Sequence, residues 1–160
     1  MIRNLIIIDE NSRAILSTNF GVCHSLGEDD EMVSGFISAV HAFSKLIDAE
    51  SVDEIQLGTL TFILMSKGNL VFAVSADDNN LEEHRVTLTK IIDLFEDLYD
   101  YYTMCIQPDI DVAIFHEFPK FLVDQDILKP NCGNYIECEE CPNSTKSLPL
   151  EEMVEELKQK

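Results

Sequence analysis

The sequence predicts one α+β domain built on a five-stranded, mainly antiparallel sheet with helices on its faces. Two observations support this prediction: short apolar runs rich in β-branched residues, and two longer segments whose apolar residues recur with the period of a helix. The order is strand, strand, helix, three strands, helix, helix. With 160 residues, of which 46% are hydrophobic, the chain is long enough to bury the core of one domain.

The first two predicted strands are residues 2–8 and 14–20, which form a hairpin. Residues 2–8 are mostly apolar and rich in isoleucine, as is typical of a strand covered on both faces. Asp29 or Asp30 is expected to cap a helix of about five turns with one apolar stripe. The stripe comprises Met32, Val33, Phe36, Ile37, Val40, Phe43, Leu46 and Ile47.

Three short strands are predicted next, at residues 52–57, 60–65 and 70–75. The last two are joined by a hairpin turn at 66–69, in which Gly68 can adopt a positive φ. The apolar residues of these strands and of the long helix are numerous enough to fill the space between them. We therefore expect no ligand pocket there.

A second long helix is predicted from Asn80, which together with Glu83 has the pattern of a capping box. A further helical stretch, capped by Asp109 or Asp111, should be kinked or split by Pro119. The aromatic residues of this region are mostly expected in the core. They are Phe95, Tyr99, Tyr101, Tyr102, Phe115, Phe118 and Phe121, of which Tyr101 falls off the stripe.

The composition changes near residue 129, which predicts three segments. Residues 1–128 form the domain, residues 129–147 a polar, cysteine-bearing loop, and residues 148–160 a short amphipathic helix. The apolar face of this last helix is formed by Leu150, Met153, Val154 and Leu157. An isolated helix of this length is marginal in water, so it either docks on its own domain or binds a partner.

The element order and several segments resemble the longin domain of vesicle SNAREs, clathrin-adaptor small subunits and tethering-complex subunits. The opening resembles those proteins at Met1–Asp9, Asn11 and Ala14–Leu16, and the later part does so at Leu60–Leu64 and Ile91–Tyr99. The resemblance covers about residues 1–125. Its motifs are patterns of apolar positions, which specify a fold better than a function.

The resemblance implies a non-catalytic adaptor or scaffold that binds a small Ras-like GTPase or another longin or roadblock chain. The related roadblock fold begins with a helix, which this chain lacks, and no SNARE segment follows the domain, so a fusion role is not implied. Longin-like proteins of this size are known chiefly from archaea close to eukaryotes. A sheet edge with unpaired amides would also permit a homodimer.

The cysteines provide an alternative hypothesis. Cys132, Cys138 and Cys141 have the spacing C-x5-C-x2-C in a segment with little core, and a CxxC pair lets two thiolates bind one tetrahedral zinc. Cys105 is the first candidate for a fourth ligand and His116 the second. A redox pair or an iron–sulfur cluster remains open, so the rival function is metal binding or redox sensing.

The acidity of the chain excludes several classes of partner. Thirty acidic residues against 11 basic ones give a net charge of −19, and the basic residues are not clustered, so binding to nucleic acid or anionic lipid is not expected. The apolar run Leu5–Ile8 is too short for a secretory leader or a membrane span, which predicts a cytoplasmic protein. No phosphate-binding glycine loop or nucleophile triad is present. We therefore predict that the chain is not an enzyme.

Overall fold

The structure is a computed structural model, and it describes residues 1–11, 13–20, 30–46, 52–58, 60–100 and 111–129. The predicted α+β class and the predicted order of elements are confirmed, with the last predicted helix divided into a 3₁₀ helix and a short α-helix. The elements are β1 (Ile2–Ile8), β2 (Ala14–Asn19), α1 (Asp30–Leu46), β3 (Glu54–Leu57), β4 (Leu60–Lys67), β5 (Leu70–Ala76), α2 (Leu81–Leu98), η2 (Val112–Phe115) and α4 (Phe118–Asp124).

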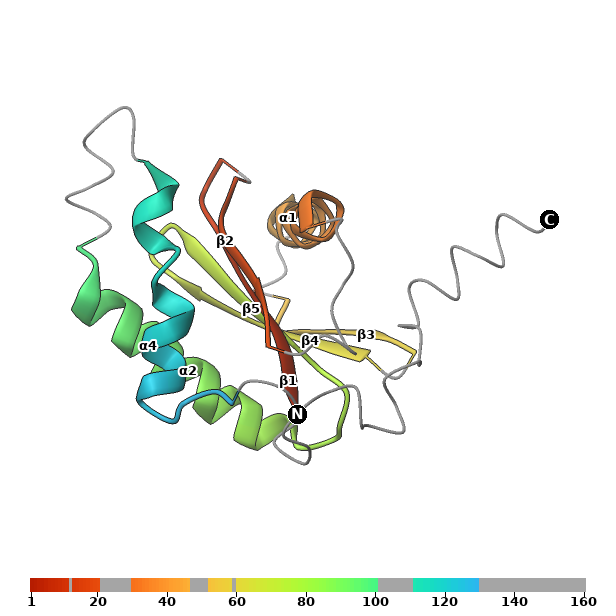
Figure 1. The fold of residues 1–160 in the computed structure, drawn as a ribbon. Coiled ribbons are helices and arrows are strands. Elements are labelled where there is room, and N and C mark those ends of the chain that lie inside the picture. The colour runs from red at the N-terminus through yellow and green to blue at the C-terminus, as the bar shows by residue number, and fades with distance from the viewer. Residues whose placement is uncertain (12, 21–29, 47–51, 59, 101–110, 130–160) are drawn as a thin grey trace, which may run out of the picture.

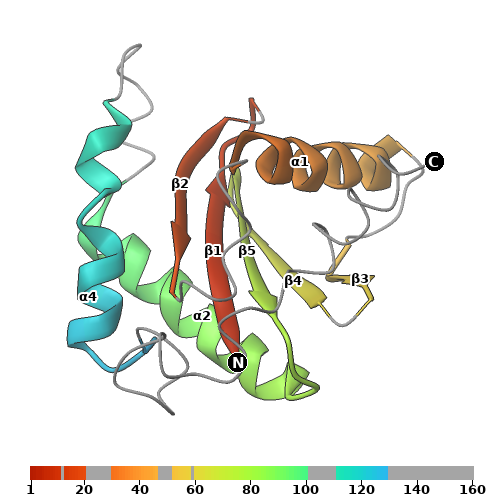
Figure 2. The ribbon, with the colours of Figure 1, turned by 45° about the vertical axis from the view of Figure 1, so that its right-hand side comes forward.

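The five strands form one sheet in the order β2-β1-β5-β4-β3, and every neighbouring pair is antiparallel. Figure 2 shows this order across the sheet. In the register of the central strands, Ile7 pairs with Leu16 on one side and with Phe72 on the other. Every residue of β1 and β5 is buried, as their mostly apolar sequences predict for strands covered on both faces.

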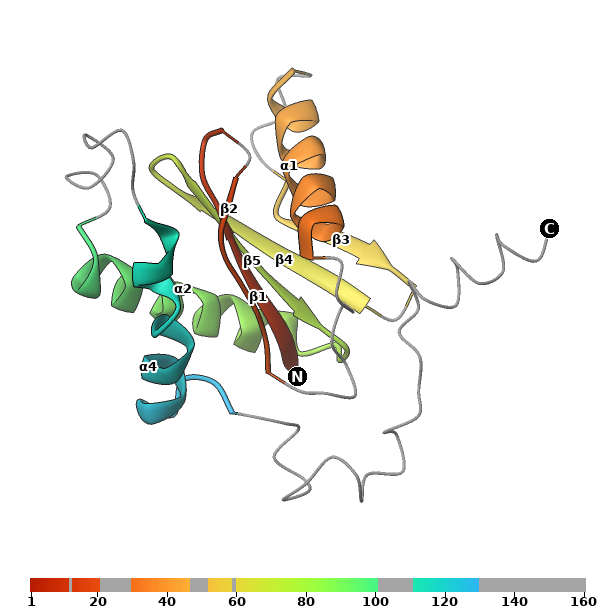
Figure 3. The same cartoon turned by 45° about the horizontal axis from the view of Figure 1, so that its top comes forward.

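Helices cover the two faces of the sheet, which gives three layers (Figure 1). Helix α1 lies on one face, where Val33 and Ile37 pack against the strands. Helices α2, η2 and α4 lie on the other face, on the opposite side of the sheet from α1 (Figure 3). Alternate residues of each strand therefore enter different cores: Leu5 and Ile7 face α2, whereas Ile6 and Ile8 face α1.

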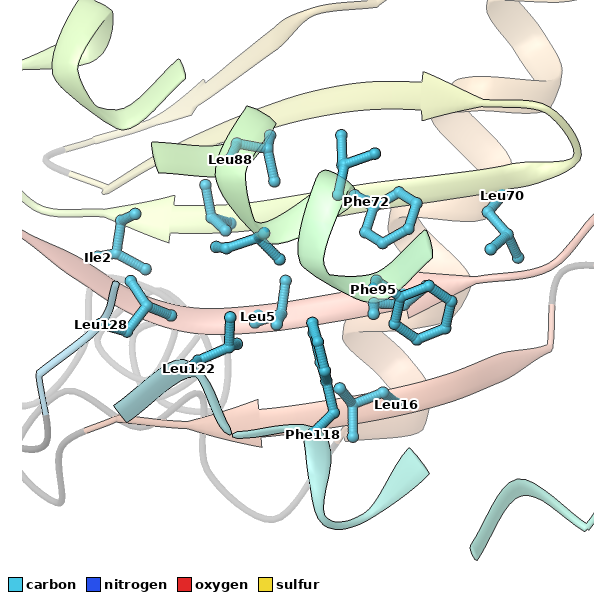
Figure 4. Packing of buried hydrophobic residues seen from close by; sticks show 14 of the residues in the cluster. Ile2, Leu5, Leu16, Leu70, Phe72, Leu88, Phe95, Phe118, Leu122 and Leu128 are labelled. Atoms are coloured by element: carbon cyan, nitrogen blue, oxygen red, sulfur yellow. The ribbon is translucent and has the colours of Figure 1, made fainter. Parts of the chain in front are cut away.

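The core beneath α2 is rich in aromatic rings. Phe95 of α2 lies with its ring centroid 5.5 Å from that of Phe72, 5.4 Å from Phe115 and 5.1 Å from Phe118. Figure 4 shows Phe95 with Phe72 and Phe118, and Leu122 belongs to the same core cluster. All five side chains are completely buried. This cluster attaches η2 and α4 to α2 and, through Phe72, to the sheet.

Two local predictions about caps differ in outcome. Asp111 caps η2, because its carboxylate accepts a hydrogen bond of 2.9 Å from the backbone N–H of Ala113, and Pro119 lies in the first turn of α4, where its missing N–H is not needed. The capping box at Asn80 is wrong, since its side chain makes no capping hydrogen bond. The Asp78 carboxylate accepts from the backbone N–H of Asn80 at 2.9 Å instead.

The turn between β4 and β5 is shorter than predicted. Ser66 and Lys67 belong to β4, which leaves Gly68 and Asn69 as a two-residue turn. Gly68 has φ of 57°, the positive value that a type II′ turn requires at its first central position. This tight turn fixes the register of the hairpin, in which Lys67 pairs with Leu70.

Candidate protein-interaction surface

The site residues named from the sequence lie outside the described residues. These residues are Cys105, Cys132, Cys138 and Cys141 as metal ligands, and Leu150, Met153, Val154 and Leu157 as a partner-binding face. The segments 130–147 and 148–160 also fall there. Of the residues that the structure describes, no group of three or more His, Cys, Asp or Glu side chains could hold a metal ion. The zinc site and the tail helix therefore stay predictions.

The outer face of α1 carries large apolar side chains in contact with solvent. Met32 is 53% exposed, Phe36 is 39% exposed and Phe43 is 60% exposed. Their spacings of four and seven residues place all three on one side of the helix. The sequence placed them on the stripe that packs on the sheet, and this prediction is wrong because the stripe is wider than the contact. Val33 and Ile37, on the inner side, are buried.

Gly35 lies on the exposed part of α1 and has no role in packing. A Cβ atom added there would have nothing within 4 Å, and glycine inside a helix costs about 1 kcal/mol relative to alanine. The fold therefore gains nothing from a glycine at this position. A glycine does leave room for the backbone of another molecule to approach the helix closely.

The sheet offers a second exposed feature at β3. Among the described residues no strand pairs with the outer side of β3, which makes it an edge of the sheet. The strand has four residues, and Glu54 and Gln56 on it are exposed. Short edge strands with charged residues resist uncontrolled pairing with other chains. The α1 face is thus the more extensive apolar feature of the two.

Most basic side chains near the sheet are already paired with acids. The pairs are Arg3 with Asp77, Arg13 with Asp9 at 3.0 Å, Lys67 with Glu96 at 3.4 Å, and Arg85 with Glu54 at 3.3 Å. These pairs neutralise the bases, so the described surface has no basic patch that would attract phosphate. The remaining acids favour a partner whose contacting face is basic.

A polar cluster joins the start of β1, the residues after β5 and the first turn of α2. The α-amino group of Met1 lies 3.1 Å from Asp77 and also contacts Asp78, while the Arg3 guanidinium donates to Asp77. The Nε2 atom of His84, a buried residue of α2, lies 2.6 Å from the Asp78 carboxylate. The sequence assigned Asp77 and Asp78 to a turn, and the structure adds that they hold these three elements together.

The pKa values of two groups in this cluster are lowered by the net effect of burial and neighbouring charges. Burial and the nearby Met1 amine lower the pKa of His84, although the charges of Glu83 and Asp77 act in the opposite direction. Burial also raises the pKa of Asp77, but the hydrogen bond and charge of Arg3 and the Met1 amine outweigh it, so that pKa is lowered overall. Because the unfolded chain takes up these protons more readily than the folded chain, both shifts lower the free energy of unfolding as the pH falls.

The His84→Gln substitution is expected to flatten the pH dependence of stability below neutral pH. In the wild type, the unfolded chain takes up a proton at His84 as the pH falls below about 6.5, whereas the folded chain resists protonation. The free energy of unfolding therefore decreases through this range, and a glutamine removes that contribution. Urea denaturation between pH 5 and 7.5 measures the effect, with His116→Gln as the control for loss of an exposed imidazole. A profile for His84→Gln no flatter than that of the control would contradict the prediction.

Comparison with known proteins finds a structural likeness and no match in sequence. No protein-family model and no curated protein sequence matches the chain. Among solved structures, Myxococcus xanthus MglB superposes with a TM-score of 0.44 and 16% sequence identity, covering 60% of this chain and 85% of that one. A likeness at this level transfers no residue role and no activity. Among the described helices, none is long and apolar enough to cross a membrane.

Proposed function

We propose that this chain is a non-catalytic, longin-like adaptor that binds another protein through the outer face of α1. The observation that carries the proposal is the row of exposed apolar side chains formed by Met32, Phe36 and Phe43. Methionine and aromatic side chains are enriched at protein interfaces, and buried aromatic anchors contribute most of the binding energy.

The position of this row on α1 also supports an interface. The three side chains lie on a continuous helix of 17 residues, over a distance of about 16 Å from Met32 to Phe43 at the rise of an α-helix. The helix is anchored through Val33 and Ile37, so the row is presented on a rigid support. A rigid surface loses little entropy when it binds.

The proposed partner is a small Ras-like GTPase or another longin or roadblock chain, acting in GTPase regulation or vesicle trafficking. This assignment follows from the resemblance of the strand and helix segments to longin domains. The excess of acidic residues would speed the encounter with a partner that has a basic face. A second copy of this chain is the alternative partner, through α1 or through the edge of β3.

A pull-down with small Ras-like GTPases from the same genome tests the proposal. Each GTPase is immobilised with GDP or with a non-hydrolysable GTP analogue, and the full chain is passed over it. We expect at least one GTPase to retain the chain, and more strongly in one nucleotide state. Retention of none in either state would remove the GTPase as partner. A single monomeric species in sedimentation at the highest concentration used would then exclude the homodimer as well.

A further inference from the structure

A pocket of about 420 Å³ lies between the second half of α1 and the adjacent end of the sheet. The expectation that apolar side chains fill the space between helix and sheet is therefore wrong at this end. Its apolar walls include Ile8, Ile37 and Val71, which come from β1, α1 and β5. The volume falls within the range of sites that hold small molecules or single side chains.

One wall of this pocket carries a hydroxyl group without a hydrogen-bond partner. Ser38 lines the pocket and is 9% exposed, and its Oγ atom is buried and unpaired. Serines inside helices commonly donate to a carbonyl of the preceding turn, but Ser38 does not. A buried hydroxyl left unpaired costs stability, so a ligand that pairs with it gains that free energy.

Among the described side chains, no lysine or arginine pairs with the carboxylate of Glu10 at the rim of the pocket. Glu10 lines the pocket, and its carboxylate accepts a hydrogen bond of 2.8 Å from the neutral side-chain amide of Asn69 in the β4–β5 turn. The charge of the neighbouring Asp9 is balanced by Arg13, which pairs with it at 3.0 Å, and two backbone N–H groups also donate to Asp9. Glu10 therefore supplies the net charge at this site.

The described lining of the pocket contains no lysine or arginine to oppose this charge, and His41 is the one described lining residue that can become cationic. Lys67 is close in sequence to the lining residue Ser66, but it belongs to the opposite face of the sheet, where it pairs with Glu96 at 3.4 Å. An anionic ligand such as a phosphate or carboxylate is thus disfavoured. The lining suits a ligand with an apolar stem and a cationic head.

We propose that this pocket receives a basic side chain, lysine or arginine, of the protein partner. The aliphatic stem would lie against Ile37 and Val71. The cationic head would pair with Glu10 and, once the Ser38 side chain rotates its buried Oγ toward the pocket, with that hydroxyl as well. The inference rests on the proposed function for the source of the side chain. The chemistry of the pocket can be tested without any partner.

The test is a titration of the full, ¹⁵N-labelled chain with n-butylammonium chloride, the analogue of a lysine side chain, followed by amide chemical shifts at constant ionic strength. Sodium pentanoate, which has the same stem and a negative head, is the matched probe. We expect saturable shifts at amides lining the pocket with butylammonium and not with pentanoate. Glu10→Gln and Ser38→Ala should each weaken binding by about fivefold or more.

Two features of the design keep the result interpretable. A glutamine at position 10 still accepts the hydrogen bond from Asn69, so the rim is preserved, and Glu82→Gln on α2 is the control for a lost charge elsewhere. Absence of saturable shifts at the pocket, equal binding of pentanoate, or unchanged affinity in both pocket variants overturns the inference. Butylammonium binding without retention by any partner would instead count against the proposed function alone.

Discussion

Replacing Phe95 with alanine is expected to lower the free energy of unfolding by about 3–5 kcal/mol, as for other fully buried phenylalanines. Phe95 is completely buried, and its ring packs against Phe72 of the sheet, Phe115 of η2 and Phe118 of α4. The substitution removes the central ring and leaves a cavity whose walls belong to three separate elements, so the structure cannot easily collapse into it. Urea denaturation monitored by circular dichroism measures the loss.

The size of this effect matters because domains of this kind are only marginally stable, by about 5–15 kcal/mol. Phe43→Ala is the matched control: it removes the same side chain from a position that is 60% exposed, so it should cost about 1 kcal/mol or less. If both variants lose similar amounts, then the aromatic cluster does not hold the second layer of helices to the sheet.

The parts of the fold that follow from local patterns were predictable from the sequence. The apolar residues that make up most of β1 predicted a strand buried on both faces, and the helical spacing of Phe115, Phe118 and Leu122 predicted their place in the core. These patterns depend only on the period of a strand or a helix. The sequence could therefore supply the element order and most of the core.

Features that depend on the position of distant segments were not predictable in the same way. The contacts of Met1 and Arg3 with Asp77 arise because β1 and β5 pair with Ile2 opposite Ala76, across more than 70 residues. Likewise, the hydrogen bond near the start of α2 is accepted by the Asp78 carboxylate, from the backbone N–H of Asn80, and the Asn80 side chain makes no cap. Asp78 is held in this position by the same cluster. Both sets of contacts depend on the register of β1 against β5, which the local sequence pattern does not give.

The exposed apolar row on α1 was not predicted, because the sequence does not give the orientation of the helix on the sheet. The apolar positions of α1 cover more of the helix circumference than one contact with a sheet can bury, which is a signal that the sequence contains. However, the sequence does not say which side of that wide stripe faces the strands. The structure selects Val33 and Ile37 for the inner side and leaves Met32 and Phe43 in solvent.

The double substitution Met32→Ser and Phe43→Ser is expected to reduce retention by the protein partner by about 30-fold or more. Removal of an interface anchor commonly costs about 2 kcal/mol or more, and each 1.4 kcal/mol corresponds to a factor of ten in affinity. Because both side chains are more than half exposed in the free chain, the free energy of unfolding should change by less than about 1 kcal/mol. Fluorescence anisotropy with the retained partner measures the affinity.

Val86→Ser separates loss of this surface from a general loss of apolar exposure. Val86 is 56% exposed, like the two α1 residues, but it lies on α2, on the opposite side of the sheet. A partner that binds the α1 face is insensitive to this control and sensitive to the double variant. A partner that retains full affinity for both variants does not use these α1 side chains, and the edge of β3 is then the next surface to test.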